Sequence, residues 1–166
     1  MKTIARTVAA VAALSIATGA FAEAHEEAAE AAPNPHFQFE GTLDGFELAG
    51  GVGGEVFGGA WKEVLTIGSG ENTTTVMSTC IGMDQPESAM FDRHFTCSQQ
   101  TKNGESKGAV LFGCNIENEA GNEMSCYGFF EGKEGAVEGH DSLQTAYYTF
   151  MPDGTGKVVG SGQWIR

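Results

Sequence analysis

Four cysteines carry the chemistry that residue type and spacing constrain most in this sequence. They are Cys80, Cys97, Cys114 and Cys126. In an exported chain, an even number of cysteines predicts disulfides, and four cysteines can pair in three ways. A three-residue hairpin loop at 119–121, with Gly121 in the left-handed conformation, places Cys114 opposite Cys126. A turn centred between Ser88 and Ala89, at the end of the turn-forming stretch 84–88, likewise places Cys80 opposite Cys97.

A zinc site made of all four cysteines is the alternative to two disulfides. Structural zinc sites use closely spaced C-x2-C pairs, and this sequence has none. It also lacks the G-x-S-x-G, H-E-x-x-H and phosphate-binding loop motifs of common enzyme classes. His140 and Asp141 lie in a glycine-rich acidic stretch, 132–141, that is typical of a loop. The sequence therefore assigns no catalytic residue, and whether the protein is an enzyme stays open.

Asp92 and His94 are the one acid and histidine pair placed for general base catalysis. They lie two residues apart on an expected strand and so share a face, where Asp92 could orient His94. The competing interpretation puts both on the solvated outer face, with Arg93 and Phe95 on the other face. We favour the outer face.

The amino end has the pattern of a secretory signal peptide. Lys2 and Arg6 are followed by a small apolar run at 8–17 and by the A-x-A cleavage site at 20–22. The apolar run is shorter than the roughly 20 residues that a membrane-spanning helix needs. The pattern predicts cleavage after Ala22 and a periplasmic or secreted protein.

Cleavage after Ala22 would create a metal-binding terminus at Glu23, Ala24 and His25. The free amine, two amide nitrogens and the imidazole form a square-planar nitrogen set, which Cu(II) and Ni(II) prefer. Adventitious binding is the competing interpretation, and the sequence predicts no other cofactor. Residues 23–36 are acidic, rich in alanine and closed by two prolines, so we expect a flexible arm before a domain at 37–166.

Composition narrows the classes of partner. The chain has 166 residues, 41% of them hydrophobic, with 9 Lys and Arg against 22 Asp and Glu, for a net charge of -13. Nucleic acids and anionic membranes are bound through clustered Lys and Arg, which this chain lacks. The composition predicts one folded domain that binds no nucleic acid and inserts into no membrane.

Short runs of β-branched and aromatic residues alternate with turn residues along the rest of the chain. The runs are Phe37 to Phe39, Phe46 to Leu48, Glu55 to Ile67, Thr73 to Met83, Met90 to Gln99, Ala109 to Ile116, Glu123 to Phe130, Gln144 to Met151 and Lys157 to Ile165. Strong turn signals stand at Asp44-Gly45, Asn103-Gly104, Ala120-Gly121 and Pro152-Asp153-Gly154. The pattern predicts an all-β sandwich or barrel. Glycines within the runs, namely Gly82, Gly113, Gly128 and Gly160, favour a barrel, because tight coiling leaves little room for side chains.

The last strand carries a resemblance to a known family. The segment Gly154-Thr155-Gly156-Lys157-Val158-Val159-Gly160-Ser161-Gly162-Gln163-Trp164 follows two cysteine-bearing strands and an acidic hairpin. This order resembles small exported bacterial proteins with an allene oxide cyclase-like barrel, over roughly the last half of the chain. The resemblance implies an eight-stranded antiparallel up-and-down barrel of the calycin type, with an apolar interior and no catalytic residue that can be carried over. Gly59-Ala60-Trp61 is similar to the G-x-W tripeptide of lipocalin-like barrels, a second candidate.

Three classes of function follow from such a barrel. A binding protein would use inward aromatic residues to line a cavity for a small apolar ligand, with Trp61, Phe95, Phe112 and Tyr147 as candidates. A cyclase or isomerase would place an ionisable group inside, His94 or a buried glutamate, with a pKa shifted by burial. A structural or partner-binding barrel would show an exposed apolar patch without a cavity, and its simplest form is a homodimer through the barrel exterior.

Overall fold

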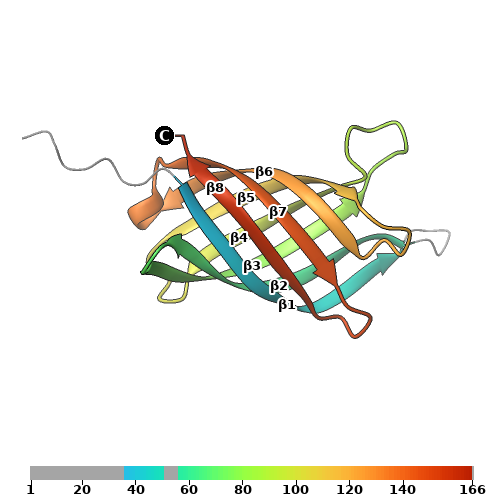
Figure 1. Cartoon of the computed structure of the whole chain (residues 1–166), viewed down its shortest axis with the longest axis horizontal. Coiled ribbons are helices and arrows are strands. Elements are labelled where there is room, and N and C mark those ends of the chain that lie inside the picture. Colours follow the sequence, from blue (N-terminus) through green and yellow to red (C-terminus); the bar gives the residue numbers. More distant parts are fainter. Residues whose placement is uncertain (1–35, 51–55, 166) are drawn as a thin grey trace, which may run out of the picture. The chain divides into compact units, whose positions relative to one another are not determined.

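Eight antiparallel strands make up nearly all of the described chain (Figure 1). The computed structural model describes residues 36–50 and 56–165. The elements are β1 (His36–Gly50), β2 (Val56–Ser69), β3 (Asn72–Asp84), β4 (Arg93–Thr101), β5 (Lys107–Ile116), β6 (Glu123–Glu134), the short 3-10 helix η1 (Gly135–Val137), β7 (Asp141–Phe150) and β8 (Gly156–Trp164). Each strand pairs with the next, and β8 pairs with β1, which closes the sheet. The predicted all-β, eight-stranded antiparallel up-and-down barrel is confirmed.

Three predictions lie outside the described residues. These are the signal peptide at 1–22, the arm at 23–36 apart from its last residue, and the metal-binding terminus at Glu23, Ala24 and His25. His36, which was assigned to the arm, is the first residue of β1.

The amino-terminal strand differs from the sequence prediction. The runs Phe37 to Phe39 and Phe46 to Leu48 were expected to be two strands, with a turn at Asp44-Gly45, and this was wrong. Both belong to β1, which pairs with β2 on either side of a register shift between Asp44 and Glu47. Gly45 has φ 68°, and the amide of Gly45 donates a 2.7 Å hydrogen bond to the Asp44 carboxylate. Such a left-handed glycine can form a bulge within a strand as well as a turn between strands.

The other turn signals are confirmed. Gly104, Gly121 and Gly154 all have positive φ in connections between strands. In the β5–β6 connection the amide of Gly121 donates to the carbonyl oxygen of Asn118 at 3.1 Å, and the side chains of Asn118 and Asn122 hydrogen-bond to each other. The geometry is that of the predicted three-residue loop.

Both predicted disulfides are present. Cys80–Cys97 joins β3 to β4, and Cys114–Cys126 joins β5 to β6. In each case the two cysteines are direct cross-strand partners, as counting outward from the turns predicted. Because all four sulfurs are in disulfides, none is free as a thiolate ligand for the alternative four-cysteine zinc site.

Glycines on the inner face of the barrel leave room for aromatic rings. A Cβ atom at Gly128 would overlap the ring of Phe112, and one at Gly162 would overlap the ring of Phe37. Gly113 is different, because it lies on the outer side of β5 under the ring of Phe91. The glycines that favoured a barrel in the sequence therefore act mainly by accommodating the aromatic core.

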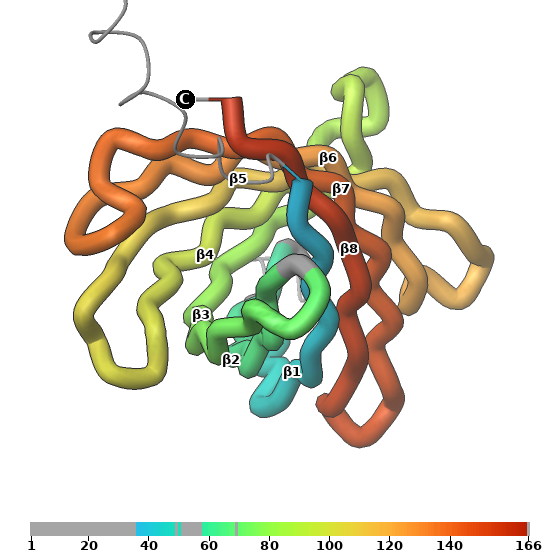
Figure 2. Tube along the Cα trace, turned by 60° about the vertical axis from the view of Figure 1, so that its left-hand side comes forward, coloured from blue at the N-terminus to red at the C-terminus, as the bar shows by residue number. Residues whose placement is uncertain are grey.

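The up-and-down topology divides the connections between the two ends of the barrel. The end of β1, the start of β2 and the β3–β4, β5–β6 and β7–β8 connections lie at one end, on the right in Figure 1. The β2–β3, β4–β5 and β6–β7 connections lie at the other end, which Figure 2 brings forward, together with the start of β1 and the end of β8. Among the described residues no helix is long and apolar enough to cross a membrane.

Candidate functional site

Aromatic side chains fill the middle of the barrel. The rings of Trp61 and Tyr148 both lie against Phe95, with ring centroids 5.0 and 5.2 Å from it, and Phe112 packs on Phe95 at 5.2 Å. All four residues are buried. This layer separates the interior into two ends, and a pocket lies at each.

The larger pocket, which we call the wide pocket, has a volume of about 660 Å³ and lies at the end of the barrel where β1 ends, β2 begins, and the β3–β4, β5–β6 and β7–β8 connections lie. Its buried or half-buried apolar lining consists of Phe46, Trp61, Phe95, Met124 and Phe150. The ring of Phe46 packs against both Trp61 and Phe150, with ring centroids 5.8 and 5.0 Å apart. The wide pocket is therefore a mouth whose floor is the aromatic layer.

One ion pair stands in the wall of the wide pocket. The Nε of Arg93 donates to Oδ1 of Asp84 at 2.6 Å, and an Nη1 hydrogen of Arg93 points to the carbonyl oxygen of Gly121 at 3.3 Å. The same nitrogen lies 3.6 Å from the sulfur of Met124. The guanidinium is thus already occupied by protein groups and ties β4 to the β5–β6 connection.

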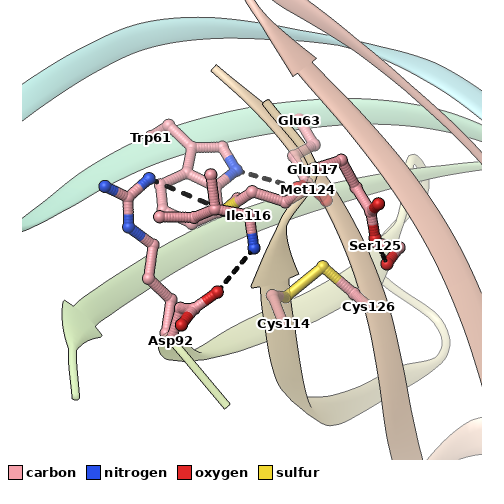
Figure 3. The surroundings of a disulfide bond; sticks show 10 residues. Trp61, Glu63, Asp92, Cys114, Ile116, Glu117, Met124, Ser125 and Cys126 are labelled. Carbon is pink, nitrogen blue, oxygen red and sulfur yellow. Dashed lines mark hydrogen bonds between the residues drawn. A yellow bond between two sulfur atoms is a disulfide. The ribbon is translucent and has the colours of Figure 1, made fainter. Parts of the chain in front are cut away.

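A carboxyl group is buried directly beneath the floor of the wide pocket. Glu63 is 2% exposed, and its Oε1 accepts a 2.8 Å hydrogen bond from the indole Nε1 of Trp61, as Figure 3 shows. Its Oε2 and the Oγ of Ser78 have no hydrogen-bond partner among the described residues. Burial raises the pKa of Glu63, although the polar groups of Trp61, Tyr148 and Ser78 oppose that shift. Burial, with Glu63 beside it, also raises the pKa of Tyr148 well above its ordinary range.

Glu63 begins a row of inward polar residues on three neighbouring strands. The register places Glu63 opposite Ser78, and Ser78 opposite Gln99. All three are buried. The row leads from the middle of the barrel to its second end, where Gln99 lines a smaller pocket of about 240 Å³, which we call the narrow pocket.

The four predicted ligand-binding residues are placed in three different environments. Trp61 and Phe95 line the wide pocket, whereas Phe112 lies in the packed layer and lines neither interior pocket. Tyr147 lies on the outer face, where its hydroxyl donates to the Glu123 carboxylate at 2.9 Å. The inward tyrosine of this strand is its neighbour Tyr148.

Asp92 and His94, the predicted acid and histidine pair, contact different groups, although His94 also lines the wide pocket. His94 lies against the ring of Phe91, with centroids 5.4 Å apart, and Oδ2 of Asp92 accepts a 2.8 Å hydrogen bond from the amide of Ile116 (Figure 3). Phe95 points into the barrel, as the outer-face interpretation requires. His140 lies between η1 and β7, 6.3 Å from the ring of Trp164.

Within the described residues, potential metal ligands converge at one place. A carboxylate oxygen of Glu63 and the sulfurs of Cys80 and Cys97 lie within 4.8 Å of one another. Because the two sulfurs are bonded to each other, they do not offer thiolate ligands.

A buried glutamate was expected in an enzyme, but Glu63 was not singled out from the sequence. The signal was the alternation of Trp61, Glu63 and Leu65, since an inward tryptophan places the residue two positions later inside as well. No protein-family description, curated protein or solved structure matches this chain.

Proposed function

We propose that this chain is an exported barrel that binds a small apolar ligand in the wide pocket. The observation that carries the proposal is the pocket itself, about 660 Å³ of space with an aromatic floor at one end of the barrel. Ligand sites for small molecules have this size and this predominantly apolar lining. The two disulfides support an exported protein, because disulfides persist in oxidising compartments.

The chemistry of the lining supports an uncharged ligand. Among the ionisable groups that line the pocket, Arg93 and Asp84 pair with each other, and the exposed Asp153 carboxylate accepts hydrogen bonds from Thr155, so the aromatic floor itself carries no charge. The rings of Trp61, Phe95 and Phe150 offer faces and edges on which an apolar molecule gains contact. Covering these surfaces with a ligand removes apolar area from water, which provides the driving force for binding.

A matched pair of leucines tests the proposal. Leu48 lines the wide pocket and is 61% exposed, whereas Leu111, on the outer face of β5, is 56% exposed and lines neither interior pocket. We expect Leu48→Glu to weaken binding of the neutral dye N-phenylnaphthylamine by about tenfold, because a carboxylate at the wall must be desolvated beside the dye. Titration of dye fluorescence measures this, and Leu111→Glu should bind like the natural protein. Equal affinity for all three proteins would contradict a site in the wide pocket.

A second candidate function is a cyclase or isomerase that acts on an apolar substrate. Glu63 favours it, because a buried carboxyl with a raised pKa can stay protonated and donate a proton in a dry site. The indole of Trp61 separates Glu63 from the wide pocket, so this function requires the indole to move aside. The reaction would relocate a proton within the substrate and would need no redox partner.

The test of this second candidate is a search for products of unchanged mass. The protein is incubated with an apolar extract of its host, and compounds that disappear and appear are compared by chromatography and mass spectrometry. Glu63→Gln should abolish the conversion and leave dye binding intact. Conversion that persists in Glu63→Gln would exclude the carboxyl as the proton donor.

The structural or partner-binding alternative is less well supported. Leu111, Phe129 and Leu143 are exposed cross-strand neighbours on β5, β6 and β7 and form an apolar row on the outer face. That class, however, expected a barrel without a cavity, and the described part of this barrel has a pocket at each end. The pockets favour ligand binding over a purely structural role.

A further inference from the structure

We propose that the narrow pocket is a second binding site, specific for a small uncharged ligand that carries a carboxamide or lactam group on a single ring. It lies at the opposite end of the barrel from the wide pocket and is walled off from it by the aromatic layer. Binding at the narrow pocket is therefore independent of what the wide pocket binds.

The walls of the narrow pocket suit a flat ring. Trp164 lies 5.1 Å from Phe37 and 5.9 Å from Phe130, measured between ring centroids, and all three line the space. Val76 on β3 and Val137 in η1 add aliphatic surface. A volume of about 240 Å³ lies below the usual range for drug-sized ligands, so the ligand is no larger than a substituted ring.

Two buried amides face this apolar space. The side chain of Gln99 lines the pocket, is only 7% exposed, and makes no hydrogen bond with any residue that the structure describes. Gln144 also lines it and is buried, and its Nε2 donates to Oγ of Ser142 at 3.1 Å, which leaves its Oε1 available to accept. The unpaired polar atoms of these two amides still reach water through the pocket, so a ligand that pairs with them replaces that water and is oriented by them.

The required ligand chemistry follows from these amides. The amide of Gln99 offers both a donor and an acceptor, and Gln144 offers a further acceptor. A ligand amide or lactam presents an N–H next to a C=O and can satisfy such a set, whereas a hydrocarbon ring leaves it unpaired. A site built to hydrogen-bond a polar ligand discriminates strongly against the analogue that lacks the polar group.

Charged ligands do not suit the narrow pocket. No acidic residue lines it, so an ammonium group would find no counter-charge. Lys107 reaches its edge, but the Nζ of this residue lies 2.6 Å from the Glu134 carboxylate. An anion would therefore compete with an existing ion pair in a protein whose net charge is already -13.

The experiment uses three probes that share one ring: benzamide, benzoate and benzylamine. The chain has two tryptophans, and Trp164 lines the narrow pocket whereas Trp61 lines the wide one. In an NMR titration of the whole protein, with Trp164→Phe to assign the two indole signals, we expect benzamide to shift the Trp164 indole in a saturable way. Benzoate and benzylamine should bind at least about tenfold more weakly, and the Trp61 signal should stay in place.

A variant with its matched control tests the role of the amide. Gln99→Leu roughly keeps the size of the side chain and removes its hydrogen-bonding groups. It should weaken the binding of benzamide at least about tenfold. Gln38→Leu changes an exposed glutamine of β1 that does not line the narrow pocket. This control variant should bind benzamide as tightly as the natural protein.

Several outcomes would overturn the proposal: benzamide with no effect on Trp164, equal binding of the three probes, or undiminished binding by folded Gln99→Leu. If benzamide has no effect, the pocket holds water only. If Gln99→Leu does not fold, the comparison of the three probes on the natural protein still decides between a specific amide site and none. Dye binding to the wide pocket is recorded on the same samples, so failure of one site is distinguished from failure of the other.

Discussion

The two ends of the barrel are built from the same eight strands but differ in chemistry. At the end that holds the wide pocket, aromatic rings, methionines and Leu48 supply the apolar lining, and Arg93 pairs with Asp84. At the other end the space is about a third as large, and buried glutamines face it. The difference arises within single strands: β4 contributes Phe95 to the wide pocket and, four residues later, Gln99 to the narrow one. One strand therefore presents an apolar side chain at one end of the barrel and a polar side chain at the other.

The largest effect on the free energy of unfolding should come from removing a disulfide. The two disulfides close loops with sequence separations of 17 and 12 residues, for which chain entropy gives about 3 kcal/mol each. We expect either double Cys→Ala variant, Cys80 with Cys97 or Cys114 with Cys126, to lower the free energy of unfolding by about that amount, measured by chemical denaturation.

Both disulfides should also matter for binding at the wide pocket. Cys114–Cys126 closes the β5–β6 hairpin, which contributes Met124 to the lining, and Cys80–Cys97 closes the β3–β4 hairpin, which contributes Phe95. Figure 3 shows Cys114–Cys126 and Met124. Removal of either disulfide should therefore weaken dye binding. If neither double variant loses dye affinity, the two hairpins do not shape the wide pocket, and the contrast between the ends must be revised.

Strand alternation and turn chemistry allowed part of this arrangement to be predicted. The hairpin loop around Gly121 fixed the partner of Cys114, because each residue counted outward from a turn has a defined cross-strand neighbour. By contrast, the sequence of β7 does not show which of its residues face inward. Its inward residues include Gln144 and Tyr148, whereas the outward ones include Leu143 and Tyr147, so hydrophobicity does not distinguish the two faces. For this reason the sequence prediction chose Tyr147 instead of the inward Tyr148.

The remaining features depend on closure of the sheet. Gln99 and Gln144 lie 45 residues apart in sequence, and only the packing of the barrel brings them to one pocket. The volumes of the two pockets depend equally on which rings meet in the middle layer, and that layer draws on β2, β4, β5 and β7. Glu63 was harder to find than the cysteines because a charged residue within a strand normally faces water.

A smaller effect concerns the pH dependence of stability. It tests whether ionisation of Glu63 affects only the folded barrel or also binding at the wide pocket. The folded state raises the pKa of Glu63, mainly by burial, so the folded protein holds a proton that the unfolded chain releases near pH 4.5. The stabilising contribution of this proton is complete below that pH and is lost as the pH rises through the folded pKa. Glu63→Gln keeps an acceptor for the Trp61 indole and cannot ionise. Above the folded pKa we expect the variant to be more stable than the natural protein, by about 1 to 3 kcal/mol, the cost of a buried polar group without its partner.

Urea denaturation of both proteins at a series of pH values measures this difference. The gap in the free energy of unfolding should widen as pH rises from about 4.5, the ordinary glutamate value, and then become constant once Glu63 is ionised in the folded barrel. Dye affinity at the wide pocket should be the same for both proteins throughout, because the indole lies between Glu63 and the pocket. A gap that does not change with pH would mean that Glu63 titrates as it does in the unfolded chain. A dye affinity that follows the same pH profile would instead join Glu63 to the wide pocket and favour the cyclase or isomerase function over simple binding.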